Sequence, residues 1–305
     1  MLQGFHIDSV GIATILLSLI GFAVLGCGNQ STDRWRLSDF FSDTRVQALA
    51  DAAGKGDINE IDRLVAEGVD INTAGKDGMT PLLWTLWHGS HGGFERLLEH
   101  GADPNRQHSN VDIGHGRSVT TIAACCPTDS FWLEAVLKHG GETNLVESEG
   151  DINHPNSVMF PIHRAVDSRR VENLDLLIRA GADLNSKASS FGSTPLIYAA
   201  TTVWYQGVFR LLEAGADYTI KDDSGGSLAD YAIDEPRPFT PEVRYWKDKV
   251  LDFLENKGVD LEAARIKAAA KGMRTTKWTD EEWAKAMQGK GWPIPKGDSK
   301  PRPQL

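Results

Sequence analysis

A five-residue motif recurs along this chain and constrains its fold more than any other feature. The clearest copies are Gly101–Asn105 and Gly181–Asn185, and each follows an amphipathic stretch. Weaker copies occupy Gly68–Asn72, Gly140–Asn144, Gly215–Thr219 and Gly258–Glu262. The copies recur at intervals of about 33 residues or somewhat more, which is the spacing of a repeat solenoid with insertions.

The residues of the motif predict how each helix ends. Glycine provides the left-handed residue that terminates a helix, and the Asp or Asn that follows suits a tight turn. Upstream lies a second phrase, which is Thr80-Pro81-Leu82 in one copy and Thr194–Ala200 in another, with Phe160–Ala165 as a variant. Thr is a good N-cap and Pro fits the first helical position. Each unit is therefore predicted to contain a turn, a short helix, another turn and a longer helix.

These two phrases in register resemble the ankyrin repeat family, and the resemblance covers about residues 46 to 260. It implies an all-α solenoid of about six helix-turn-helix units within residues 43–262. The third and sixth units depart from the family pattern, because Thr120–Cys125 and Ser227–Ala232 stand in place of Thr-Pro-Leu-His-x-Ala. The predicted units are 43–75, 76–110, 111–150, 151–188, 189–222 and 223–262.

The two ends of the chain are predicted to differ from the repeats. Residues 27–42 read as a tether that also caps the first repeat, and residues 263–305 as a helical C-terminal cap with a polar tail. Leu261–Lys271 is predicted to be helical, and Thr279–Glu282 has the form of a capping box. The tryptophans of this tail are expected to pack over the final repeat rather than bind a partner; they are Trp278, Trp283 and Trp292.

The N-terminal 26 residues resemble a secretory signal peptide. An apolar run from Val10 to Leu25 is short for a membrane span, and it precedes Gly26-Cys27-Gly28, which resembles a bacterial lipobox. The resemblance implies lipidation of Cys27, with the chain on the periplasmic side of a cell envelope and sorted to the outer membrane. Because the first nine residues contain Asp8 and no Lys or Arg, an uncleaved anchor or a buried helix remains the alternative.

The overall charge limits the class of partner. The formal net charge is −10 at pH 7, and no dense run of Lys or Arg offsets it. Nucleic acids and anionic membrane surfaces favour basic patches. We therefore expect no nucleic-acid partner, and contact with a membrane only through the lipid anchor.

Catalytic and metal-binding patterns are weak. No Gly-x-Ser-x-Gly elbow or phosphate-binding loop occurs, so the sequence predicts no enzyme and no cofactor. Two inserted loops carry potential metal ligands, but their spacing matches no closed zinc pattern. Cys125 and Cys126 are neighbours whose expected role is as small buried side chains rather than a redox switch. The potential ligands of the loops are His108, Asp112, His115, Glu149, Asp151 and His154.

The remaining candidate is a protein-binding surface. The family resemblance implies that partners contact the hairpin tips and the concave face of the first helices. Trp87 and Phe191 stand out because aromatic side chains anchor many interfaces, although Trp87 could instead fold onto Trp84. The implied tip residues are Lys76, Asp77, Met79, Ser190, Phe191 and Ser193. The implied helix residues are Trp87, His88, Asp167, Ser168, Thr201 and Thr202.

Three functions are compatible with these features. The first is a non-enzymatic, envelope-anchored binding module that is monomeric when free. The second is a periplasmic immunity protein that neutralises a secreted antibacterial effector such as a lipase, with an acidic concave surface matching a basic toxin. The third is a metal or small-ligand sensor that uses the inserted loops. His163, at the His position of the family phrase, is expected to hydrogen-bond between turns.

Overall fold

The computed structural model describes the chain as helices joined by turns. The described residues are 35–109, 116–126, 129–147, 159–188, 191–233 and 240–270, with no side-chain description for 267–270. The chain divides into two compact units, Met1–Pro195 and Leu196–Leu305. Within the described part, extended pairing is limited to isolated bridges such as Gln107 with Ser118. The predicted all-α fold is therefore confirmed.

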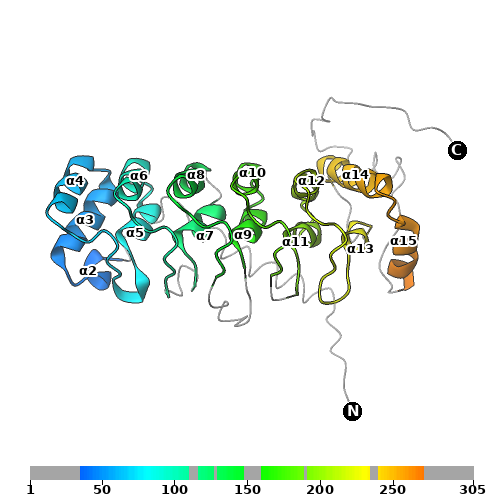
Figure 1. The fold of residues 1–305 in the computed structure, drawn as a ribbon, viewed down its shortest axis with the longest axis horizontal. Helices are drawn as coiled ribbons and strands as arrows, with labels where there is room; N and C mark the ends of the chain where they lie inside the picture. Colours follow the sequence, from blue (N-terminus) through cyan, green and yellow to red (C-terminus); the bar gives the residue numbers. More distant parts are fainter. Residues whose placement is uncertain are drawn as a thin grey trace, which may run out of the picture. The chain divides into compact units, whose positions relative to one another are not determined.

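The first unit is built from repeated helix pairs. Figure 1 shows its helices in two rows, and the first helix of every pair lies beside the first helices of its neighbours. The first helices are α3 (Thr44–Lys55), α5 (Pro81–His88), α7 (Val119–Ala124) and α9 (Pro161–Ser168). The second helices are α4 (Ile58–Ala66), α6 (His91–Glu99), α8 (Phe131–Lys138) and α10 (Val171–Arg179). A short helix, α2 (Leu37–Phe40), precedes them, and the 3-10 turn η2 (Lys76–Gly78) lies at a hairpin tip.

The helix ends follow from the two sequence phrases. Thr80 caps α5 by accepting a hydrogen bond from the backbone N–H of Leu83, and Pro81 occupies the first helical position. Gly101, which follows α6, has φ +88°, a left-handed conformation that side chains with a Cβ rarely adopt. The apolar residues between these ends pack between the two rows. This core includes Leu49, Ile61, Leu82, Phe94, Leu97, Trp132, Ile162 and Leu174.

The register predicted for the third repeat is wrong by two residues. Ser118, not Thr120, caps α7 and accepts a hydrogen bond from the N–H of Thr121. Thr120 is buried within the helix, where its hydroxyl donates to the carbonyl of Pro104 at 3.1 Å. As a result Ala123 and Ala124 occupy the paired-alanine positions, and Cys125 follows them as Trp87 and Asp167 do in their own repeats.

Asparagines of the five-residue motif join neighbouring repeats. The side-chain amide of Asn105 donates to the carbonyl of Gly140 at 2.8 Å, and its Oδ1 accepts from the N–H of Glu142 at 2.8 Å. Asn72 makes the equivalent pair with Gly101 and Asp103. Each asparagine therefore satisfies a helix-terminal carbonyl and a turn N–H of the next repeat.

Asn105→Ala is expected to lower the free energy of unfolding by about 1 to 3 kcal/mol, because it removes both bonds and leaves their partners to water. Urea denaturation followed by circular dichroism measures this change. Asn59→Ala is the matched control, since Asn59 is exposed on α4. Equal stability of the two variants would contradict a joining role for Asn105.

The second unit is also built from helices that pack in pairs. It comprises α11 (Pro195–Thr201), α12 (Tyr205–Glu213), α13 (Leu228–Ala232), α14 (Pro241–Asn256) and α15 (Leu261–Ala270). Helix α12 packs against α14, and α13 packs against α15. Lys247 of α14 is buried with its ammonium 5.9 Å from the ring centre of Tyr205. The helix predicted over Leu261–Lys271 is present as α15 as far as Ala270, the last described residue.

Several predicted features lie outside the described residues. These are the signal peptide 1–26 with its neighbour Cys27, most of both inserted loops, and the tail from residue 271, including the three tail tryptophans. Among the described helices, none combines the length and apolarity needed to cross a bilayer. At the start of the described chain, Phe40 and Phe41 are buried against the first repeat.

Candidate functional site

The hairpin tip of the second repeat presents two of the three predicted residues. Lys76 is exposed and Asp77 is half-buried with φ +57°. Met79 is fully buried, which corrects its assignment to a partner surface. The reason is its position directly before the cap of α5, where an apolar side chain enters the core.

Trp87 stacks on a tryptophan that the sequence did not connect with it. Its ring lies 4.5 Å from that of Trp35 at an angle of 27°, and both side chains are half-buried. Trp84 stacks on His88 instead, at 4.3 Å, and an imidazole nitrogen of His88 lies 2.8 Å from the carbonyl oxygen of Trp84. Trp87 is therefore one face of an aromatic pair rather than an isolated exposed anchor.

The tip before α11 carries the most exposed large apolar side chain among the described residues of the first unit. Phe191 is 71% exposed, and Val146 at another tip is 41% exposed. Ser193 is buried, and Ser190 lies outside the described residues. On α9, Asp167 and Ser168 are half-buried. Thr201 is exposed and Thr202 is half-buried, and both belong to the second unit.

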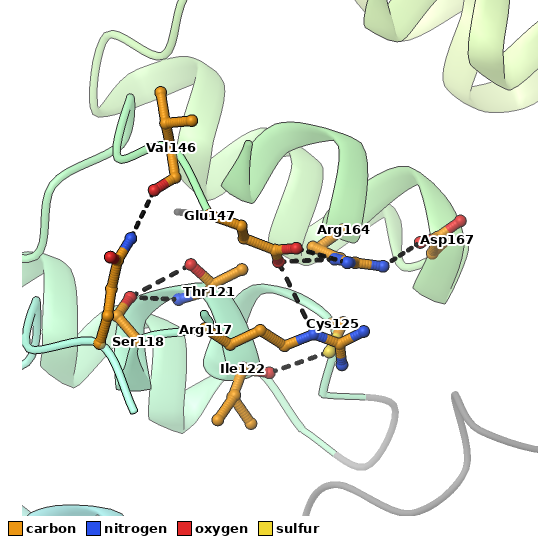
Figure 2. Close-up of polar contacts among 10 residues, drawn as sticks. Arg117, Ser118, Thr121, Ile122, Cys125, Val146, Glu147, Arg164 and Asp167 are labelled. Carbon is orange, nitrogen blue, oxygen red and sulfur yellow. Dashed lines mark hydrogen bonds and ion pairs between the residues drawn. The ribbon is translucent and has the colours of Figure 1, made fainter. Parts of the chain in front are cut away.

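A buried ion-pair cluster lies where the third and fourth repeats meet. The side chain of Glu147 is only 4% exposed and receives two hydrogen bonds from Arg164, Nε to Oε1 at 2.8 Å and Nη2 to Oε2 at 2.5 Å. Arg164 also reaches Asp167 at 3.3 Å, and Arg117 approaches Glu147 from its own repeat (Figure 2). The sequence gave no sign that Glu147 is buried, because it lies in a polar loop between helices.

The charges of the cluster set the protonation of its members. Burial alone would raise the pKa of Glu147, but the charge and hydrogen bonds of Arg164, with a smaller contribution from Arg117, hold that pKa below its usual value. Burial raises the pKa of the neighbouring Cys125 thiol, which donates a weak hydrogen bond to the carbonyl of Ile122. Cys125 is therefore a protonated thiol at neutral pH, and Cys126 is fully buried.

The inserted loops contribute one described residue to the proposed metal set. His108 is buried, with 3% of its surface exposed. Asp112, His115, Glu149, Asp151 and His154 lie outside the described residues. In the part of the chain that the structure describes, no group of three or more His, Cys, Asp or Glu side chains is arranged to hold a metal ion.

His163 forms the expected bond between turns. Its Nε2 donates to the carbonyl of Ser193 at 3.1 Å, and the side chain is fully buried on α9. Burial lowers the pKa of His163 to about 4 by disfavouring the charged imidazolium. The folded protein therefore holds a neutral imidazole at this position across the physiological range.

This burial predicts a loss of stability in mild acid. In the unfolded chain His163 is protonated below its ordinary pKa of 6.5, whereas in the folded chain it stays neutral down to its lowered pKa of about 4. The free energy of unfolding should therefore fall as the pH falls from 6.5 to 4. The loss totals roughly 3 kcal/mol. Urea titrations from pH 7.5 to 4 measure it, with His163→Leu as the control because Leu83 fills the equivalent position. An unchanged pH slope in the variant would contradict the assignment.

Acidic charge in the first unit gathers on the second helices. Those of the first unit carry Glu60, Asp62, Glu95, Glu99, Glu134, Glu172 and Asp175 against Arg63, Arg96, Lys138 and Arg179. The first helices carry Arg45, Lys55 and Arg164 against Asp51 and Asp167. The expected acidic surface is therefore not found on the described first helices, whose charges nearly balance.

Comparisons with known proteins agree with this architecture. Residues 77–109 match the family model described as Ankyrin repeat. The chain is 24% identical over 189 residues to Mitochondrial disaggregase from Bos taurus, a match that covers 61% of this chain and 21% of that protein. It is 34% identical over 97 residues to Transient receptor potential cation channel subfamily A member 1 from Homo sapiens, covering 30% of this chain and 9% of the channel. The chain thus spans only a small part of either relative.

A solved structure resembles the helix-pair arrangement over a longer part of the chain than the single matched repeat. The crystal structure of EF0377, an ankyrin repeat protein, superimposes with a TM-score of 0.51 and 25% identity, covering 61% of this chain and 90% of EF0377. Residues 77–109 are thus similar to an ankyrin repeat, and the stacked helix pairs form an all-α repeat solenoid of the ankyrin-repeat kind.

Proposed function

We propose that this chain is a non-enzymatic protein-binding module, held in a bacterial cell envelope by a lipid on Cys27, and that it is monomeric when free. Ankyrin repeats generally bind other proteins, and their partners contact a surface rather than a catalytic pocket. The binding surface we propose comprises the first helices and hairpin tips of residues 35–195, here called the recognition face.

One observation carries this proposal. Near the end of each first helix, two buried residues are followed by one at the surface. That surface residue is Trp87 in α5, Cys125 after α7 and Asp167 in α9. These structurally equivalent residues are all half-buried, yet their chemistry differs from repeat to repeat. The positions beneath them are uniformly buried, as with Leu86, Ala124 and Val166. A regular core under a varied surface is suited to recognising one particular partner.

Three histidines of this unit have structural contacts rather than a catalytic arrangement. His88, His100 and His163 each make a contact that fixes the fold, with the Trp84 carbonyl, the Asp62 carboxylate and the Ser193 carbonyl respectively. General acid-base catalysis needs an imidazole within reach of substrate and titrating near neutral pH. His163, buried with a pKa of about 4, meets neither condition.

The proposed partner is a protein of the envelope, or a toxic effector delivered into it, such as a lipase, in which case the chain is an immunity protein. The lipobox at Cys27 supports the location. The nearly balanced charge of the first helices gives no added support to a strongly basic toxin. A metal or small-ligand sensor has less support, because the side chain of His108, one of its proposed ligands, is buried.

Affinity capture tests the binding proposal. The tagged full chain is crosslinked in its own envelope and after exposure to competitor cells, and captured proteins are quantified by mass spectrometry. Phe191→Ala combined with Lys76→Glu changes two exposed tip residues and should reduce capture of a stoichiometric partner at least tenfold. The matched control, Glu134→Ala with Arg179→Glu on the second helices, should capture normally. Equal loss in both pairs, or no stoichiometric partner for the wild type, would refute the recognition face.

Palmitate labelling tests the location separately. The wild type is expected to incorporate labelled fatty acid and to fractionate with the outer membrane, and Cys27→Ala is expected to lose both properties. A wild type without label would remove the lipid anchor from the proposal while leaving the capture result intact.

A further inference from the structure

Arg117 places a charge where the second and fourth repeats bury a methionine. The residue before the cap of the first helix is Met79 in the second repeat and Met159 in the fourth, with exposures of 0% and 6%. The corresponding residues of the first and fifth repeats are serines, the exposed Ser42 and the buried Ser193. In the third repeat this residue is Arg117, which precedes the cap Ser118. Its side chain is 24% exposed. A guanidinium therefore stands where the second and fourth repeats have an apolar side chain, and it lies beside Cys125 (Figure 2).

The contacts of Arg117 leave most of its guanidinium unused. Among the described residues its one ion pair joins Nε to Glu147 Oε1 at 3.7 Å, beyond hydrogen-bond distance. Both carboxylate oxygens of Glu147 already accept shorter bonds from Arg164, at 2.8 and 2.5 Å. The Nη1 and Nη2 atoms of Arg117 have no hydrogen-bond partner in the described part of the chain.

A structural role explains Arg117 poorly. Glu147 is neutralised chiefly by Arg164, and Arg117 lowers its pKa less. Methionine at the equivalent positions of the second and fourth repeats fills the core without the cost of desolvating a charge. Residues that break a local rule without a local gain are expected at functional sites. An arginine fork whose two terminal nitrogens bond no described residue is shaped to bind a carboxylate through two parallel hydrogen bonds.

We propose that Arg117 is the charged anchor of the recognition face and that it binds a carboxylate of the partner protein, from an Asp or Glu side chain or a chain terminus. The assignment rests on the proposed binding function and specifies its chemistry. Glu147 and Arg164 position Arg117, because their hydrogen-bonded pair lies beside it, with Glu147 Oε1 3.7 Å from Arg117 Nε. The partner segment that meets the third and fourth repeats is therefore acidic.

Capture by Arg117 variants of the full chain tests this assignment. Arg117→Met installs the residue found at the equivalent positions of the second and fourth repeats and should leave the melting temperature unchanged or raised, while reducing capture of the wild-type partner at least tenfold. Arg179→Met, which removes the same charge from an exposed position on α10, should capture normally. A melting temperature that falls by several degrees in Arg117→Met would show that Arg117 acts in folding and would overturn the assignment.

Zero-length crosslinking identifies the bound group. The amine that Arg117→Lys introduces is coupled by carbodiimide only to a carboxylate in ion-pair contact, and an isopeptide bond to an acidic residue of the partner is expected. A bond only to a carboxylate of the same chain, whether Glu147, Asp112, Glu149 or Asp151, would overturn the assignment. A partner captured equally by wild type and Arg117→Met would overturn it while sustaining the binding function, whereas a wild type that captures nothing would refute both.

Discussion

Glu147→Gln is expected to lower the free energy of unfolding by about 3 to 5 kcal/mol, because it removes the charge that compensates a largely buried guanidinium. The Arg164 side chain is 15% exposed and directs two hydrogen bonds to Glu147. Water cannot replace this carboxylate without opening the contact between the third and fourth repeats. Urea denaturation followed by circular dichroism and tryptophan fluorescence measures the loss.

A double variant separates the buried charge from the packing. Glu147→Met combined with Arg164→Met removes both charges and keeps apolar volume, so it should recover much of the stability lost in the single variant. A single variant that remains within about 1 kcal/mol of wild type would mean that the pair is solvated, contrary to the 4% exposure of Glu147.

Gly93→Ala is expected to destabilise the protein by about 3 kcal/mol. A Cβ at this position of α6 would lie 1.9 Å from the carbonyl oxygen of Ala53 in α3, and this backbone atom cannot rotate away. The two helices would have to separate, opening the core between the first and second repeats. Thermal unfolding measures the change as a lower melting temperature.

The neighbouring glycine supplies the control. A Cβ at Gly92 would meet only Ile58 Cδ1 at 3.8 Å, an ordinary contact. Gly92→Ala should therefore be neutral or stabilise by up to about 1 kcal/mol through helix propensity. If both alanine variants behaved alike, close approach of α6 to Ala53 would be excluded as the reason for glycine at position 93.

Local chemistry explains what the sequence predicted correctly. Helix ends depend on one or two residues, so Gly101 and the Thr80-Pro81 pair mark them without knowledge of the fold. The third repeat failed the same test for a local reason. It lacks the proline, and Ser118, Thr120 and Thr121 can all cap a helix, so composition alone does not select Ser118. The insertion before this helix removes the repeat spacing that would have distinguished them.

The side-chain clusters were not predictable because their members are remote in sequence. Glu147 is buried only because Arg164 comes from the next first helix to meet it. The rings of Trp35 and Trp87 stack although the two residues are 52 positions apart in the sequence (87 − 35 = 52). The sequence did not single out Arg117, because its equivalence to Met79 and Met159 depends on the corrected helix cap at Ser118. Contacts of this kind follow from how neighbouring repeats pack, and single-residue propensities do not contain that information.

The asparagine bonds between repeats have a consequence for how such a chain can evolve. They join the turns that follow the second helices, whereas the two predicted insertions lie further along the chain, at about residues 106–118 and 146–158. Lengthening a hairpin tip therefore breaks neither these bonds nor the packing of the helix pairs. Selection for a new binding specificity can act on the length and composition of the tips while the joints between repeats are inherited unchanged.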